Sequence, residues 1–85
     1  MIEYQITFQK QAIKALAKLN DPIFSRIKIA IQQLAINPKP KGFKQLKGRS
    51  GFRIRIGDYR VIYEIDGLIL QIDIIDLGHR KDIYE

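Results

Sequence analysis

The stretch FRIRIGDYRVIY, residues Phe52 to Tyr63, decides the fold of this chain. On both sides of Gly57-Asp58 its side chains alternate with a period of two, which is typical of half-buried strands. A two-residue connection that begins with glycine favours a type II′ turn between antiparallel strands. The stretch therefore predicts a tight hairpin in which Arg55 faces Arg60.

A second turn signal, Asp66-Gly67, follows one strand length later and favours a type I′ turn. A hairpin centred there places Ile65 opposite Leu68 and Arg60 opposite Asp73. One predicted face is then entirely apolar or aromatic and comprises Phe52, Ile54, Ile56, Tyr59, Val61, Tyr63, Ile65, Leu68, Leu70, Ile72 and Ile74. The other predicted face comprises Arg53, Arg55, Arg60, Ile62, Glu64, Ile69, Gln71 and Asp73.

The first half of the chain predicts one strand and two helices. Ile2–Phe8 alternates as a strand does, and Gln9–Leu19 has apolar residues at helical spacing. Asp21-Pro22 is typical of an N-cap followed by proline at the first helical position, and Asn37-Pro38 ends this second helix. We therefore expect an α+β fold: an N-terminal strand, a two-helix hairpin and a three-stranded antiparallel meander, with the helices on its apolar face.

Length and composition narrow the class of protein. With 85 residues, 1–85 is expected to form a single domain around a modest core. The chain has no cysteine, which excludes disulfides and thiolate sites and fits a cytoplasmic location, and no stretch approaches the roughly 20 apolar residues of a membrane span. A formal net charge of +6 favours polyanionic partners, although charge alone could also serve solubility.

Three arginines lie close together on the predicted charged face. Arg53 and Arg55 are two apart on one strand, and Arg60 lies opposite Arg55, so like charges repel unless something compensates them. One interpretation pairs Arg60 with Asp73 and leaves the others solvated. We favour phosphate recognition, because guanidinium groups match phosphate oxygens bidentately and stay charged at any working pH.

The C-terminal tail adds groups that suit the same chemistry. His79, Arg80, Lys81 and Tyr84 supply positive charge and side chains able to transfer protons. A lone histidine can equally be structural, and a terminal tyrosine can simply pack through its ring.

The connector Pro38–Gly42 continues into Lys44 and Lys47, and it is either a solvated loop or a phosphate-contacting one. A single histidine and scattered aspartates have no metal-ligand spacing, and no cofactor-binding motif is present. RNA cleavage needs neither metal nor cofactor. The 2′-hydroxyl of RNA can attack its own phosphate if a protein aligns it and stabilises the developing charge.

These features resemble the RelE toxins of the RelE/ParE superfamily. The segments that carry the resemblance are Leu46-Lys47-Gly48, Phe52-Arg53-Ile54-Arg55-Ile56, Gly57-Asp58-Tyr59-Arg60-Val61-Ile62-Tyr63 and Gly78-His79-Arg80. RelE toxins cut messenger RNA in the ribosomal A site by 2′-hydroxyl attack. The resemblance implies that Arg60 contacts the scissile phosphate, that Arg80 acts in the transition state, and that Tyr84 stacks on the substrate or aids proton transfer.

This chain departs from the family at the general base. Arg53 and Arg55 stand where the best-known members carry lysines, and an arginine with a pKa above about 12 is a poor base. We therefore expect Arg53 and Arg55 to bind phosphate and hold charge. His79 and Tyr84 remain the candidate proton carriers.

The resemblance also implies partners and two alternatives. The expected partners are messenger RNA, the ribosome and an acidic antitoxin that wraps the toxin and binds operator DNA through its N-terminal part. One alternative is a toxin of the ParE branch, which shares the fold but poisons DNA gyrase. The other is a non-catalytic module that binds antitoxin or ribosome.

Overall fold

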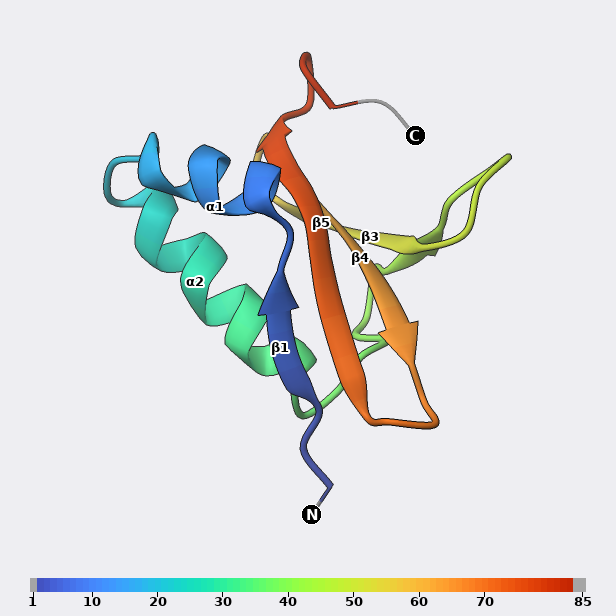
Figure 1. The fold of residues 1–85 in the computed structure, drawn as a ribbon. Coiled ribbons are helices and arrows are strands. Elements are labelled where there is room, and N and C mark those ends of the chain that lie inside the picture. The colour runs from blue at the N-terminus through green and yellow to red at the C-terminus, as the bar shows by residue number, and fades with distance from the viewer. Residues whose placement is uncertain (1, 84–85) are drawn as a thin grey trace.

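The computed structural model describes residues 2–83 and places two helices on one face of a sheet (Figure 1). The elements are β1 (Gln5–Phe8), α1 (Lys10–Ala17), α2 (Ile23–Leu34), β2 (Lys44–Gln45), β3 (Phe52–Ile56), β4 (Tyr59–Asp66) and β5 (Gln71–His79). The strands form one five-stranded sheet in the order β1-β5-β4-β3-β2. The predicted α+β class is confirmed, and β2 is the strand that the sequence did not predict.

The hairpin of β3 and β4 has the predicted register. Residues 52–56 pair antiparallel with residues 59–63 around Gly57-Asp58. Gly57 has a φ of 60°, the left-handed conformation that glycine adopts without steric cost at the first central position of a type II′ turn. Ile54 is buried, and Phe52 and Ile56 pack against the same core, as the alternation predicted.

The register of the second hairpin differs from the prediction. A four-residue loop, residues 67–70, joins β4 to β5, so Ile65 pairs with Ile72 instead of Leu68. Leu68 is 97% exposed at the tip of this loop and Leu70 is exposed too. Their predicted place in the core was therefore wrong.

The side chain of Asp66 accounts for the wider loop. Its Oδ1 accepts hydrogen bonds from the backbone N–H groups of Leu68 at 3.0 Å and Ile69 at 3.4 Å. Aspartate stabilises turns in this way by replacing a backbone acceptor with its own carboxylate. The loop also needs a residue with positive φ, which is Leu70 at 54°.

A β-bulge in β5 changes which side chains reach the core. Tyr63 pairs with Ile74, whereas its neighbour Ile62 pairs with Asp76, so β5 holds one extra residue between them. An extra residue reverses the alternation of the strand beyond it. Leu77 is consequently buried in the core, although a strict period of two did not place it there.

β1 lies at one edge of the sheet. It pairs in parallel with β5, with Ile6 aligned to Ile72, rather than lying apart from the antiparallel strands. The strand begins at Gln5 and not at Ile2, which is exposed. At the other edge, β2 pairs with β3 over only two residues, which is too short for a period to be detected in sequence.

Both helices are shorter than predicted. The helix hairpin is present, but α1 ends at Ala17, and α2 begins at Ile23 with Pro22 just before its first residue. The side chain of Asp21 accepts hydrogen bonds from the N–H and hydroxyl of Ser25. These two donors hold the pKa of Asp21 below its usual value. Asp21 thus stabilises the first turn of α2 from one position further out than an N-cap.

The core lies between the helices and the sheet. It consists of Ala12, Ile27, Ile31, Leu34, Ile54, Val61, Tyr63, Ile72, Ile74 and Leu77. The Tyr63 hydroxyl donates to the Pro38 carbonyl at 2.6 Å, which ties the connector after α2 to the sheet. Burial raises the pKa of Tyr63 to about 12. Within residues 2–83, no helix is long and apolar enough to cross a membrane.

Candidate functional site

The sheet face away from the helices carries basic side chains from three strands. Arg55 of β3 lies directly opposite Arg60 of β4, and Lys44 of β2 lies directly opposite Arg53 of β3. Directly opposed residues share a face, and so do residues two apart on one strand. The structure thus brings together four predicted site residues, Lys44, Arg53, Arg55 and Arg60, which we call the arginine face.

Burial differs strongly within the arginine face. Arg53 is only 6% exposed, and Ile62 beside it is buried as well. Arg55 and Lys44 are exposed, and Arg60 is half-buried. The side chains that a ligand can reach directly from solvent are Lys44 and Arg55, whereas Arg60 is partly covered.

No carboxylate lies opposite Arg60 in the sheet. The wider β4–β5 loop moves the register by four residues and the β-bulge by one more, so Arg60 pairs with Gly78 of β5 and the predicted pairing with Asp73 was wrong. Asp73 instead accepts hydrogen bonds from Thr7 Oγ1 at 2.9 Å and Gln9 Nε2 at 2.6 Å, at the β1 edge of the sheet. The charge of Arg60 is therefore not compensated by the aspartate that the alternative interpretation required.

Among residues 2–83, the guanidinium of Arg60 has one hydrogen-bond acceptor. Its Nη1 donates to the backbone carbonyl oxygen of Ile83 at 3.1 Å. Its Nε is buried and has no hydrogen-bond partner among residues 2–83. A buried donor without a partner is uncommon and costs stability, so it marks a position where an acceptor would be favourable.

Arg80 lies at the end of the sheet beside the β3–β4 turn. Its backbone N–H donates to the Asp58 carbonyl at 2.7 Å, and its side-chain Nε is 3.8 Å from Asp58 Oδ1. Both side chains are more than half exposed, at 52% and 63%, so this ion pair contributes little to stability. The Arg80 guanidinium is thus free to move toward a ligand.

His79 lies on the opposite face of the sheet from the arginines. It pairs with Tyr59 at the ends of β5 and β4, and the two rings pack edge to face with centroids 5.5 Å apart. Tyr59 contacts the core on the helix side. His79 Nδ1 accepts a hydrogen bond from the Lys81 N–H at 3.2 Å, which gives this histidine a structural part in the turn after β5.

The remaining candidates are dispersed. Lys47 is exposed in the loop between β2 and β3, and Lys81 is exposed in the turn after β5. Tyr84 lies outside the described residues. Among residues 2–83, no three His, Asp or Glu side chains are grouped so that they could hold a metal ion.

Sequence reasoning gave no role to Gly78 or Ile83, although both contact the Arg60 site. Gly78 is the residue opposite Arg60, and a β-carbon built on it would lie 2.9 Å from Ile83 Cγ1. The glycine was visible in the Gly78-His79-Arg80 motif. Its position opposite Arg60 depends on the bulge, which leaves no signal in the period of the sequence.

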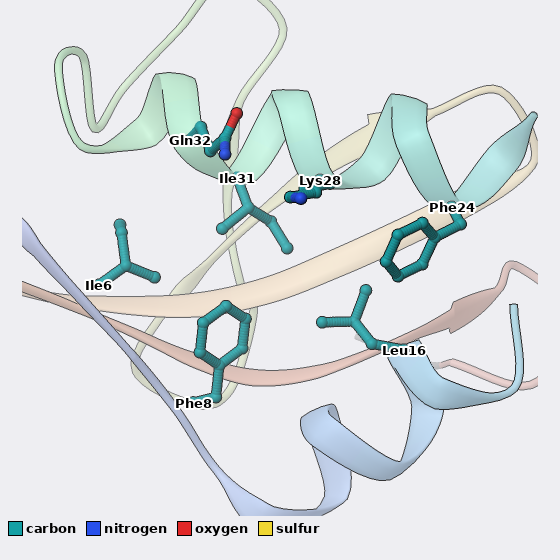
Figure 2. Close-up of a pocket in the computed structure, with 7 residues that line it drawn as sticks. All are labelled: Ile6, Phe8, Leu16, Phe24, Lys28, Ile31 and Gln32. Carbon is teal, nitrogen blue, oxygen red and sulfur yellow. The ribbon is translucent and has the colours of Figure 1, made fainter.

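The helix side of the molecule carries a groove of different chemistry (Figure 2). It has a volume of about 330 Å³, and its lining consists of Ile6, Phe8, Leu16, Phe24, Lys28, Ile31 and Gln32. The apolar side chains come from β1, α1 and α2 and point toward one another across the groove. Such a surface suits apolar side chains of a protein partner and not a phosphate backbone.

Comparison with known proteins matches this chain and its fold to toxins. The family model described as the ParE toxin of the type II toxin-antitoxin system parDE matches residues 6–84. The Toxin RelE3 of Methanocaldococcus jannaschii is 31% identical over 88 residues, which cover 95% of this chain and 96% of that protein.

Solved structures agree. The archaeal RelE–RelB complex from Pyrococcus horikoshii contains a chain with a TM-score of 0.82 and 30% identity, covering 96% of this chain and 100% of that one. The RelBE2 toxin–antitoxin complex of Mycobacterium tuberculosis contains one with a TM-score of 0.80 and 29% identity, covering 94% of each chain. The chain therefore belongs to the RelE/ParE-type toxins of type II toxin–antitoxin systems.

Proposed function

We propose that this toxin is an endoribonuclease that cuts messenger RNA in the ribosomal A site and so inhibits translation. The observation that supports this most strongly is Arg60: a half-buried guanidinium opposite Arg55, with an unpartnered Nε and no carboxylate opposite it. Several arginines on one face, with an unpartnered donor at Arg60, favour binding of a phosphate backbone. We take residues 1–85 as one domain that carries the whole activity.

In the proposed reaction the RNA supplies its own nucleophile. The 2′-hydroxyl loses its proton and its oxygen attacks the adjacent phosphorus, while the bond from phosphorus to the 5′-oxygen breaks and that oxygen takes up a proton. Arg60 contacts the scissile phosphate, Arg55 and Lys44 hold flanking charge, and Arg80 approaches the phosphorane. One well-placed donor is worth about 2.7 to 4 kcal/mol of transition-state stabilisation.

Proton transfer is assigned to Tyr84 in preference to His79. The family resemblance places a tyrosine at this point, whereas His79 packs on Tyr59 at the helix side of the sheet. Arginine retains its proton at any working pH and is excluded as the base.

Primer extension on a messenger RNA in a purified translation system tests the proposal. Codon-phased cuts are expected from the wild type, and Arg60→Ala or Arg80→Ala should lower the cleavage rate by roughly 10² to 10³. Lys14→Ala is the matched control, because it removes one positive charge from an exposed position on α1. Full cleavage by Arg60→Ala would remove Arg60 from the catalytic site, and no cleavage by the folded wild type would refute the nuclease.

Inhibition of DNA gyrase is the second candidate, because the matching family model is that of ParE toxins. A supercoiling assay with purified gyrase separates the two. Gyrase inhibition without RNA cleavage would assign the protein to the ParE branch, and binding to ribosome or antitoxin with neither activity would indicate a non-catalytic module.

An acidic antitoxin is the proposed protein partner, and we expect it to link the complex to operator DNA. Relatives from P. horikoshii and M. tuberculosis were solved as toxin–antitoxin complexes. The net charge of +6 favours an acidic partner. The groove beside β1 offers an apolar lining with Lys28 beside it, which suits an amphipathic acidic segment.

A further inference from the structure

The turn after β5, residues 80–83, folds back onto the arginine face. It is held by backbone hydrogen bonds from Asp82 and Ile83 to the His79 carbonyl at 2.8 and 3.2 Å, and from Arg80 to the Asp58 carbonyl at 2.7 Å. Its last residue presents the carbonyl oxygen that Arg60 Nη1 binds at 3.1 Å. We call residues 80–83 the tail turn.

Gly78 is what allows the tail turn to come this close. A β-carbon at position 78 would lie 2.9 Å from Ile83 Cγ1 and 3.1 Å from Cδ1, so the Ile83 side chain occupies the space that any larger residue would fill. Gly78 is also the residue directly opposite Arg60. The side chain of Ile83 therefore packs on β5 at Gly78, directly beside Arg60. The carbonyl oxygen of Ile83 accepts the hydrogen bond from the same Arg60.

The donors of Arg60 are not open to a phosphate in this conformation. A guanidinium holds two oxygens of one phosphate through Nε with Nη2 or through Nη1 with Nη2, because only in these pairs do the N–H groups point the same way. Arg60 Nε is buried and has no partner within residues 2–83, so the first pair is closed to solvent. Nη1, which the second pair needs, donates to the Ile83 carbonyl oxygen, which thus stands where a phosphate oxygen would bind.

We propose that the tail turn is an internal competitor for Arg60: it closes the phosphate subsite in the free toxin, and a phosphate must open it before two donors of this guanidinium can hold the phosphate oxygens. This inference rests on the proposed function, since it concerns how the same arginine becomes available to RNA. Gly78 is then a positioning residue that permits the closed state, and the subsite is gated by the chain's own backbone.

A reversible disulfide between two introduced cysteines tests the closing of the tail turn directly, because the natural chain has no cysteine that could form a competing disulfide. Ile83 Cγ1 lies 2.9 Å from the β-carbon position at residue 78. With a carbon–carbon bond of about 1.5 Å, the two β-carbons lie within about 4.5 Å, inside the reach of a disulfide. Gly78→Cys combined with Ile83→Cys therefore closes the tail turn when oxidised and releases it when reduced.

The measured quantity is the binding of inorganic phosphate, which is monitored through the NMR resonance of the Arg60 Nε–H group. This resonance is assigned by its disappearance in Arg60→Ala. The reduced double variant should bind phosphate and shift this resonance. The oxidised form should bind about tenfold or more weakly. Gly78→Cys alone is the control and should give the same affinity under both redox conditions.

The outcomes separate this inference from the proposed nuclease. Equal phosphate affinity in the oxidised and reduced double variant overturns the gate, and so does the absence of any phosphate-dependent shift in the reduced form. A redox-dependent affinity combined with no RNA cleavage by the wild type supports the gate and refutes the nuclease alone.

Discussion

Arg60 is the residue at which the sheet, the tail turn and the proposed substrate meet. Its guanidinium is withdrawn from water yet keeps an unpartnered Nε, and leaving such a donor unmet costs about 1 to 3 kcal/mol. A donor held in place before the substrate arrives needs no reorganisation during the reaction, which is the condition for strong electrostatic stabilisation. A phosphate oxygen that accepts a hydrogen bond from Nε removes this cost, so the free energy recovered adds to the affinity of the site for phosphate.

Tyr63 is a second residue whose polar group matters, because its hydroxyl contributes to stability in addition to the packing of its ring. Its hydroxyl donates to the Pro38 carbonyl at 2.6 Å from a fully buried ring. Tyr63→Phe should lower the free energy of unfolding by about 1 kcal/mol, because the connector loses this hydrogen bond. Urea denaturation measures the change. Tyr4→Phe is the control: the Tyr4 hydroxyl makes no hydrogen bond within residues 2–83, and unchanged stability is expected.

The same tyrosine predicts a loss of stability in alkali. Burial raises its pKa from 10.0 to about 12, so the neutral phenol is favoured in the folded state. Its contribution is complete below pH 10 and is lost as the pH rises through about 12. Unfolding free energies at pH 9 and pH 11.5 should therefore differ less in Tyr63→Phe than in the wild type. An equal alkaline loss in both proteins would contradict this assignment.

Single residues of the site were predictable where local alternation fixes the face. Arg55 and Arg60 were placed together from the Gly57-Asp58 turn, and the structure has them directly opposed. His79 was grouped with them by sequence proximity, but the bulge turns it to the other face. The role of Gly78 could not be predicted, because it depends on the same bulge.

Among the elements, the two hairpins show why one turn signal succeeded and the other failed. Gly57 fixes a two-residue turn through its backbone conformation alone. Asp66 instead bonds its side chain to the N–H groups of Leu68 and Ile69, and this wider loop moves the pairing of Ile65 by four residues, from Leu68 to Ile72. A shift by an even number preserves the faces, so Ile72 and Ile74 lie in the core as predicted, although Leu68 and Leu70 do not.

Gly51, just before β3, is the element-scale position where a glycine is required. Its φ is 115°, and a β-carbon there would lie 3.2 Å from the Tyr63 carbonyl oxygen and 3.3 Å from Leu46 Cδ1. Gly51→Ala should lower the free energy of unfolding by roughly 1 to 3 kcal/mol, through backbone strain and these close contacts.

The matched control for that substitution is Gly67→Ala in the β4–β5 loop. Gly67 has no positive φ and no atom within 4 Å of its β-carbon position, so alanine there should leave stability unchanged or raise it by up to about 1 kcal/mol. Urea denaturation of the two variants gives the comparison. Equal stability of both would show that the conformation at position 51 is not needed for the start of β3.

For the whole molecule, the sheet separates two surfaces of opposite chemistry. The arginine face presents charge on one side. The groove among β1, α1 and α2 presents apolar side chains on the other (Figure 2). A polyanion and an amphipathic protein segment can therefore bind without sharing contact residues. Anchoring an antitoxin in the groove leaves its remaining length to reach the arginine face.

Because the two surfaces are separate, one substitution should affect antitoxin binding alone and another should affect RNA cleavage alone. Phe8 is 38% exposed and lines the groove, so Phe8→Asp should weaken binding of the proposed acidic antitoxin by more than about tenfold while RNA cleavage is retained. Arg60→Ala should lower the cleavage rate by roughly 10² to 10³ and leave the groove intact. Ile29→Asp is the control, since Ile29 is an exposed apolar residue of α2 that does not line the groove.

Calorimetric titration of the purified antitoxin into each folded toxin variant measures the first effect, and primer extension measures the second. If Phe8→Asp and Ile29→Asp bind the antitoxin equally well, the groove is not its anchor. If Phe8→Asp loses cleavage together with antitoxin binding, the two surfaces are coupled through β1 and β5, and the sheet transmits changes between its faces instead of separating them. Retained cleavage with lost antitoxin binding is the result that the apolar lining of the groove and the charge of the opposite face lead us to expect.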